Sequence, residues 1–108
     1  MTYDPQMLKG ILAPLLLLLL DTREDYGYSV VTRLQGAGFA ELNEGTVYPA
    51  LTRLEKAGFL TSSLRPSASG PARKYYSTTP AGRAEHQRLL AAWADLAGAV
   101  DTVIKENR

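Results

Sequence analysis

The chain has 108 residues and a net charge of +1, and it contains a single histidine, His86, and no cysteine. This length predicts one domain with a modest core. The absence of cysteine excludes disulfides, thiolate metal sites and a cysteine nucleophile, and it is most simply explained by a cytoplasmic location. With one histidine and no clustered carboxylates, the chain offers little for acid–base or covalent catalysis, so we expect neither an enzyme nor a metal or cofactor site.

The net charge conceals an uneven distribution along the chain. Residues 43–88 contain seven basic and three acidic side chains, whereas the remainder contains five basic and eight acidic ones. Such asymmetry favours a cationic face for an anionic partner. The alternative is a chance distribution of solvated charges, which would be preferred if no other feature pointed the same way.

The first predicted element contains the apolar run ILAPLLLLLL at residues 11–20. Asp4 and Pro5 predict the N-cap and first position of a helix that ends near Asp21, and Pro14 predicts a kink within it. Ten apolar residues are too few to cross a membrane, which takes about 20, and no signal-peptide cleavage site follows them. We therefore expect a buried helix, no membrane partner, and a second subunit that helps to cover the run.

Two shorter helices are predicted next, joined by a short turn. Asp25 is the expected cap of a helix from Tyr26, which ends at Gly36 or Gly38. The following helix begins between residues 43 and 46, with Asn43 as a candidate cap, and ends at Gly58. Its inner stripe consists of Val47, Leu51 and Leu54, and its outer stripe consists of Thr46, Pro49, Arg53 and Lys56.

The last part of the chain predicts a hairpin and a long helix. Strand-like runs occupy residues 59–64 and 73–78, and the segment RPSASGPA between them predicts a mobile hairpin tip. Thr79 and Pro80 predict the cap and first position of the final helix. A heptad seam along this helix needs a partner, most simply a second copy of the chain. The seam contains His86, Leu89, Trp93, Leu96, Val100 and Val103, widened by Leu90, Ala97 and Ile104.

This order of elements predicts a mainly α fold with a small β-hairpin: a winged helix-turn-helix at residues 1–79 and a C-terminal dimerisation helix at residues 80–108. An α-helix fits the DNA major groove, and the polar and cationic outer stripe of the second short helix suits that role. Arg73 and Lys74 lie at the base of the hairpin, where they would contact the DNA backbone or the minor groove. The predicted partner is therefore double-stranded DNA. A winged helix that contacts only proteins is the alternative, and it predicts no salt-dependent DNA binding.

Four stretches of the sequence resemble the PadR family of bacterial transcriptional regulators. They are LKG at 8–10, YGYSVVTRL at 26–34, LNEGTVYPALTRLEKAGFL at 42–60 and RKYYSTTPAGR at 73–83. The resemblance covers about residues 8–90. It implies a winged-helix repressor that binds inverted-repeat operators as a homodimer through its first and last helices, and that a small molecule releases in some members. The single C-terminal helix resembles the smaller branch of the family.

The resemblance also implies which residues contact DNA. Tyr48 and Pro49 match the family's YP at the front of the recognition helix, and Lys9 and Tyr28 match positions that reach phosphates in such folds. The full set of expected DNA contacts is Lys9, Tyr28, Asn43, Thr46, Tyr48, Pro49, Arg53, Lys56, Arg73 and Lys74. The family often has Gly-Arg-Pro-Arg-Lys at the wing, whereas residues 70–74 of this chain are Gly-Pro-Ala-Arg-Lys. The wing-tip arginine that would enter the minor groove is thus missing.

The expected dimer interface joins the leucine run to the last helix. Its residues are Leu15, Leu16, Leu19, Leu89, Trp93, Leu96, Val100 and Val103. Trp93 has two interpretations: it fills the interface, or it forms, with Leu89, Leu90 and Leu96, a wall for a small planar aromatic effector. The resemblance favours keeping the second interpretation open, because some family members bind aromatic effectors near such an interface.

Overall fold

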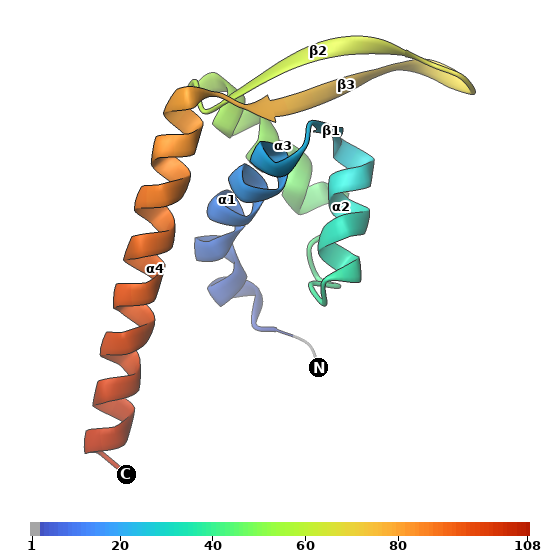
Figure 1. Cartoon of the computed structure of the whole chain (residues 1–108). Helices are drawn as coiled ribbons and strands as arrows, with labels where there is room; N and C mark the ends of the chain where they lie inside the picture. Colours follow the sequence, from blue (N-terminus) through green and yellow to red (C-terminus); the bar gives the residue numbers. More distant parts are fainter. Residues whose placement is uncertain (1–2) are drawn as a thin grey trace.

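The computed structural model of the chain describes residues 3–108 (Figure 1). The described residues form four helices and three antiparallel strands in the order α1 (Pro5–Thr22), β1 (Asp25–Tyr26), α2 (Gly27–Gly36), α3 (Glu44–Lys56), β2 (Leu60–Ser67), β3 (Gly70–Thr78) and α4 (Pro80–Glu106). The strand order in the sheet is β1-β3-β2. This architecture confirms the predicted mainly α winged helix-turn-helix, with one strand more than the sequence indicated.

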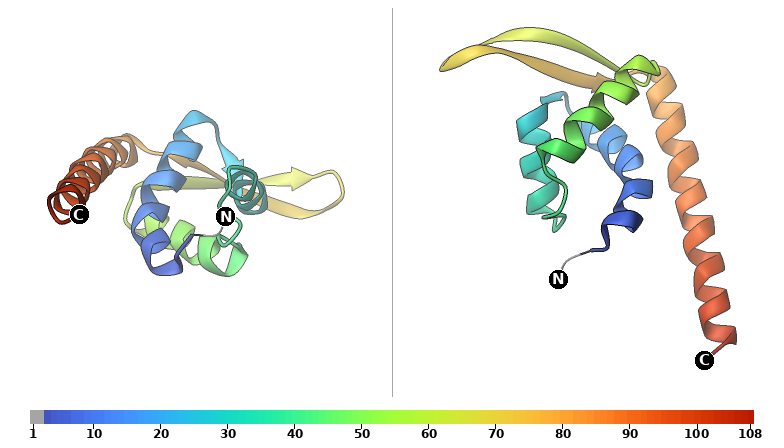
Figure 2. Two further views of the ribbon diagram at one scale, coloured as in Figure 1. Left: turned by 90° about the horizontal axis from the view of Figure 1, so that it is seen from below. Right: turned by 180° about the vertical axis from the view of Figure 1, so that it is seen from behind.

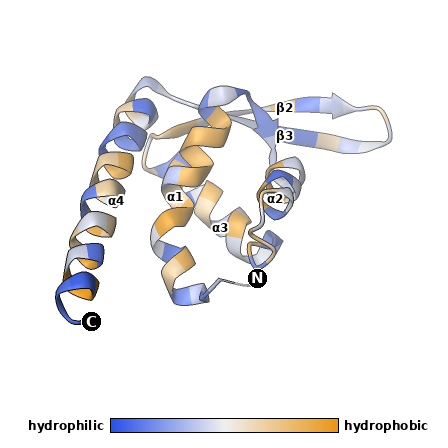
Figure 3. Ribbon diagram, turned by 60° about the horizontal axis from the view of Figure 1, so that its bottom comes forward, coloured by the Kyte–Doolittle hydropathy of each residue, from blue (hydrophilic) through white to orange (hydrophobic). Residues whose placement is uncertain are grey.

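The leucine run lies in α1, which is the central helix of the fold. Asp4 caps it as predicted, since its Oδ1 accepts hydrogen bonds from the backbone N–H groups of Gln6 and Met7 at 2.8 and 3.3 Å. By length and composition alone α1 could cross a membrane, with a mean hydropathy of 1.3. It instead packs against α3, β3 and α4 and is the most apolar helix in Figure 3. The side chains that it buries in the core are Leu8, Leu12, Leu16, Leu17 and Leu20.

The start of α2 differs from the prediction. Its N-cap is Tyr26 rather than Asp25, and Asp25 belongs to β1, where it pairs with Tyr76 of β3. The Asp25 carboxylate accepts hydrogen bonds from the Tyr26 N–H at 3.0 Å, the Ser29 hydroxyl at 2.7 Å and the Arg33 guanidinium at 3.1 Å. Asp25 therefore precedes the N-cap by one residue, and its buried carboxylate still holds the beginning of α2 in place. A strand of two residues has no periodicity by which the sequence could reveal it.

The helix-turn-helix otherwise follows the sequence pattern. Helix α3 begins at Glu44, within the predicted interval, and Leu42 and Val47 are both buried, as a hydrophobic staple requires. Gly38 and Gly58 follow the ends of α2 and α3 with φ values of 106° and 85°, which favour glycine. These terminations confirm the predicted ends of both helices and direct the chain into the next element.

The wing is longer than predicted. Strand β2 extends to Ser67 and β3 begins at Gly70, so most of the segment expected to be a mobile tip is paired backbone. Prolines within this segment are tolerated because β1 pairs only with residues 75 and 76, which leaves both wing strands with a free edge. The register also shifts between Arg65 and Ser67, beside Pro66. The paired hairpin projects from the body of the molecule (Figure 2).

Helix α4 starts close to the end of α3, packs along α1 and then leaves the body. The Thr79 hydroxyl accepts a hydrogen bond from the Gly82 N–H at 3.0 Å and donates to the Gly58 carbonyl at 2.7 Å, which confirms the predicted cap. A Cβ atom on Gly82 would lie 2.0 Å from the carbonyl oxygen of Phe59. Only glycine therefore allows this close approach. The C-terminal half of α4 extends away from the other elements (Figures 1 and 2).

Candidate nucleic-acid interface

The outer face of α3 is exposed and carries the residues predicted for it. Val47, Ala50, Leu51 and Leu54 point into the core, which leaves the opposite side of the helix in solvent. Exposed there are Asn43, Thr46, Tyr48, Pro49, Arg53 and Lys56. Within residues 3–108 neither Arg53 nor Lys56 forms an ion pair. Both cations are available to an anionic partner.

A depression of about 370 Å³ lies beside this face, where α2, α3 and β3 meet. It brings together four of the predicted site residues from three separate segments: Tyr28, Tyr48, Arg73 and Lys74. The remaining lining comes from Tyr26, Gly27, Leu51 and Tyr76. Such a combination of phenol hydroxyls and cations suits a phosphate group, because each can donate a hydrogen bond to an anionic oxygen.

Tyr48 is placed in the depression by contact with the backbone at the start of α2. A Cβ atom on Gly27 would lie 2.7 Å from a ring carbon of Tyr48, so glycine is required for the ring to lie there. Partial burial raises the pKa of the Tyr48 phenol above its ordinary value, and the negative charge of Glu44 raises it further. The hydroxyl is therefore protonated at neutral pH and can donate to a phosphate.

The two adjacent cations of β3 are in different electrostatic states. The Arg73 guanidinium lies 4.4 Å from the centre of the Tyr26 ring and has no carboxylate partner among the described residues. The Lys74 ammonium forms an ion pair with Glu55 at 2.8 Å and lies 5.3 Å from the centre of the Tyr76 ring. The two residues are equivalent in the sequence, whereas the structure leaves Arg73 free for a ligand and engages Lys74 within the protein.

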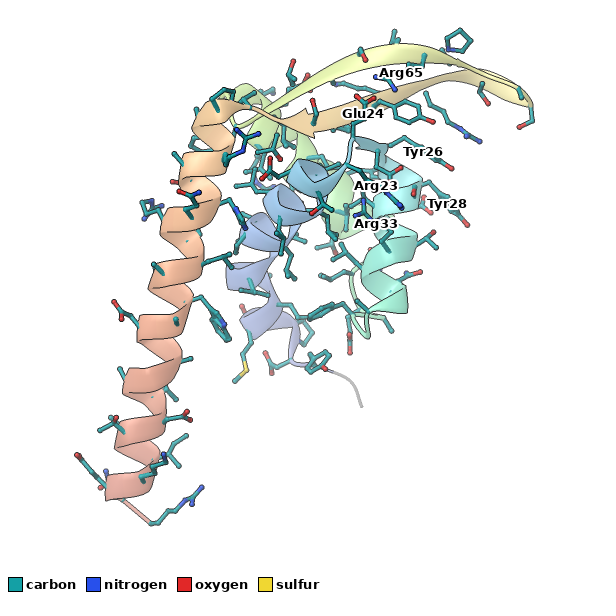
Figure 4. All side chains as sticks on the ribbon, in the orientation of Figure 1. Arg23, Glu24, Tyr26, Tyr28, Arg33 and Arg65 are labelled. Atoms are coloured by element: carbon teal, nitrogen blue, oxygen red, sulfur yellow. The ribbon has the colours of Figure 1, made fainter. Side chains whose placement is uncertain are left out.

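A cluster of planar side chains holds the base of the wing to β1. The rings of Tyr26 and Tyr75 lie 5.3 Å apart, and Arg65 lies 4.8 Å from the centre of the Tyr75 ring. The Arg65 guanidinium also pairs with Glu24 at 2.6 Å (Figure 4). Together with the contact between Arg73 and the Tyr26 ring, these contacts hold the wing against β1, directly before α2. The sequence does not reveal this cluster, because β1 itself was not predicted.

Lys9 lies apart from the tyrosine-lined depression. It is exposed on α1 and lines a smaller depression of about 80 Å³, together with Thr46 from the front of α3. The two sites flank the exposed face of α3, one at its N-terminal end and one against the wing. This arrangement is suited to two separate phosphates of one DNA backbone.

The sequence matches a known protein family. Residues 16–88 match the PadR-like family of transcriptional regulators. The chain belongs to this family. The PadR-like chain is 43% identical over 70 residues to the transcriptional regulator Rv3488 of Mycobacterium tuberculosis, an alignment that covers 62% of this chain and 64% of that protein. The family match over residues 16–88 supports the role that the sequence resemblance implied, a transcriptional regulator.

Solved structures of PadR-like regulators have the same fold over nearly the whole chain. A PadR-like regulator from Bacillus cereus is 34% identical, with a TM-score of 0.80 over 92% of this chain and 96% of its own. A PadR family regulator from Eggerthella lenta is 32% identical, with a TM-score of 0.85 over 92% of this chain and 86% of its own. The similarity includes most of α4, since it extends well beyond the matched residues 16–88.

The residues predicted to form the dimer interface and the ligand site of this PadR-like regulator differ in how deeply they are buried. Leu15, Leu19, Leu89 and Leu90 are half-buried, whereas Trp93, Leu96, Val100 and Val103 are exposed. Leu16 is completely buried in the core of its own chain, so its side chain has no surface to offer to a partner. A run of leucines has no phase from which the sequence could distinguish Leu16 from its exposed neighbour Leu18.

Proposed function

We propose that this PadR-like regulator acts in the cytoplasm, binds an inverted-repeat operator as a homodimer and represses transcription. The observation that carries the proposal is the free cationic face of α3 beside the depression that contains Tyr28, Tyr48 and Arg73. Helix α3 enters the major groove, where Arg53 and Lys56 reach base edges or phosphates. The depression receives a backbone phosphate, and Lys9 contacts a second one.

The same proposal assigns a role to each predicted unit. Residues 1–79 form the DNA-binding unit, of which the first two lie outside the described residues, and residues 80–108 form the dimerisation helix. Along α4 the seam residues Trp93, Leu96 and Val103 are 51%, 61% and 60% exposed in the single chain. A continuous apolar stripe of this kind is typical of a protein–protein interface. A second copy would cover it and place two α3 helices about 34 Å apart, in successive major grooves.

DNA binding is tested by fluorescence anisotropy with a duplex from upstream of the protein's own gene and a scrambled duplex, each at two salt concentrations. We expect tighter, salt-sensitive binding to the native duplex. Arg53→Ala is expected to weaken the preference for the native sequence, whereas Lys105→Ala, which removes an exposed cation at the far end of α4, leaves it unchanged. No binding to either duplex at low salt would refute the proposal and support a winged helix that contacts only proteins.

We further propose that a small planar aromatic effector binds between the two α4 helices against Trp93, with Leu89, Leu90 and Leu96 completing the site. Such a ligand would favour a dimer with a different separation of the α3 helices, by no more than its difference in affinity for the two arrangements. Quenching of Trp93 fluorescence by planar aromatics, together with weaker operator binding, is the expected result. If neither the Trp93 fluorescence nor the operator affinity changes with any of a panel of such compounds, this role is refuted.

A further inference from the structure

A carboxylate lies among the cations of the proposed DNA interface. Glu55 belongs to the last full turn of α3, but it turns toward the wing rather than outward with Arg53 and Lys56. One of its oxygens is 2.8 Å from the Lys74 ammonium, and the other accepts a hydrogen bond from the Ser62 hydroxyl. Glu55 therefore joins the recognition helix to both strands of the wing.

Two groups determine the position of the Lys74 ammonium. Besides the ion pair with Glu55, the ammonium lies over the ring of Tyr76, which is on the same face of β3 and is buried. The Lys74 side chain is 46% exposed and lines the same depression as Arg73. It is thus close enough to the proposed phosphate site to contact DNA, but its charge is already paired within the protein.

The pairing has a consequence for selectivity. Contacts between lysine and phosphate carry no sequence information, so a free ammonium at this place would strengthen binding to any duplex. A carboxylate at the interface also repels the DNA backbone. By pairing Lys74 and by repelling the backbone, Glu55 lowers the affinity for any duplex. A role for Glu55 in DNA binding therefore lies in selectivity, that is, in which DNA is bound.

We propose that Glu55 is a positioning residue that keeps Lys74 off the DNA backbone and thereby limits binding to non-operator DNA. This inference rests on the proposed DNA-binding function. Of the two DNA contacts predicted for the wing, Arg73 then contacts the DNA and Lys74 does not.

The test measures the salt dependence of binding to a scrambled duplex for the wild type and for Glu55→Gln. The glutamine keeps the size of the side chain and an acceptor for Ser62, but it releases the Lys74 ammonium. Each additional phosphate contact steepens the slope of log affinity against log salt by about 0.9. For each freed lysine the variant should therefore lose about 3.5-fold more affinity than the wild type over a fourfold rise in salt, and bind the scrambled duplex more tightly at low salt.

Two further variants isolate the origin of the effect. The double variant Glu55→Gln/Lys74→Met removes the freed cation while it keeps an unbranched apolar side chain, and its slope should return to that of the wild type. Glu44→Gln removes an exposed carboxylate from the other end of α3, where the described residues include no ion-pair partner for it. It releases no lysine, so its slope should match the wild type.

The results separate this inference from the function on which it rests. A slope for Glu55→Gln equal to that of the wild type, or the same steepening in the double variant, would overturn the role of Glu55. Weaker binding of Glu55→Gln to both duplexes without a change in slope would do so too, since it would indicate only structural damage. Failure of DNA binding itself would appear already in the wild type, as an absence of salt-dependent binding to either duplex.

Discussion

The buried carboxylate of Asp25 provides a sharp test of how β1 and α2 are held together. Its side chain is 8% exposed, and the guanidinium of its partner Arg33 is part of a side chain that is 19% exposed. Among residues 3–108, the one other acceptor for the Arg33 guanidinium is the Leu19 carbonyl, at 3.3 Å. The substitution Asp25→Asn keeps the shape of the side chain but leaves the guanidinium without a counter-charge in a mostly dry environment.

The expected loss follows from the three hydrogen bonds of the carboxylate. In the asparagine variant one oxygen can still accept from the Tyr26 N–H, whereas the bonds from Ser29 and Arg33 to the second oxygen are lost. Both lost bonds are made to a charged group, and such a bond contributes about 1.5–3 kcal/mol. We therefore expect a destabilisation of about 3 kcal/mol, at the lower end of the range of about 3–5 kcal/mol for breaking a buried ion pair.

Urea unfolding followed by circular dichroism at one fixed protein concentration measures this loss, because the stability of a dimer depends on concentration. With an m-value of about 1.5 kcal/mol/M, the midpoint should fall by about 2 M. Glu24→Gln is the matched control: it neutralises the preceding carboxylate, whose pair with Arg65 is solvent-exposed, and should cost at most about 1 kcal/mol. If Asp25→Asn costs no more than this control, the buried pair does not anchor α2.

Three other predictions concern α4 and the wing. Leu96→Asp should leave each chain folded but weaken dimerisation by about 100-fold or more, because it places a carboxylate in the apolar seam; light scattering that still shows a stable dimer would contradict the proposed interface. Gly82→Ala should lower the free energy of unfolding by about 1–3 kcal/mol, since its Cβ atom would meet the Phe59 carbonyl. Gly98→Ala, where a Cβ meets nothing within 4 Å, should stabilise α4 by about 0.5–1 kcal/mol. Thermal melts in which both variants change stability in the same direction would count against the close approach. The hydrogen bond from Lys74, and then that from Ser62, lower the pKa of Glu55 from its ordinary value of 4.5. The contribution of the Glu55 carboxylate to stability is therefore present above pH 4.5 and is lost as the pH falls through the lower pKa of the folded state. The difference in urea midpoint between wild type and Glu55→Gln should shrink from pH 7 to pH 3, and an unchanged difference would mean that the ion pair adds no stability.

Local patterns in the sequence determined much of this protein. Asp4 and Thr79 identify the starts of α1 and α4 because a capping side chain bonds to backbone N–H groups only two or three residues away. The 3.6-residue period likewise separates the buried side of α3 from the exposed one, and the heptad seam of α4 indicates a partner. Interactions of this kind involve neighbours along the chain, so the sequence displays them directly.

Tertiary structure alone decided the features that join distant segments. The leucine run has no polar residue to mark its faces, so only packing shows that Leu16 lies in the core and Leu18 at the surface. The pairing of Asp25 with Tyr76 creates β1 from two residues that carry no periodic signal. The contact between Glu55 and Lys74 then distinguishes two adjacent cations that the sequence presents as equivalent. The physical reason is common to all three: each depends on which distant groups the folded chain brings within a few ångströms, and no local pattern records that distance.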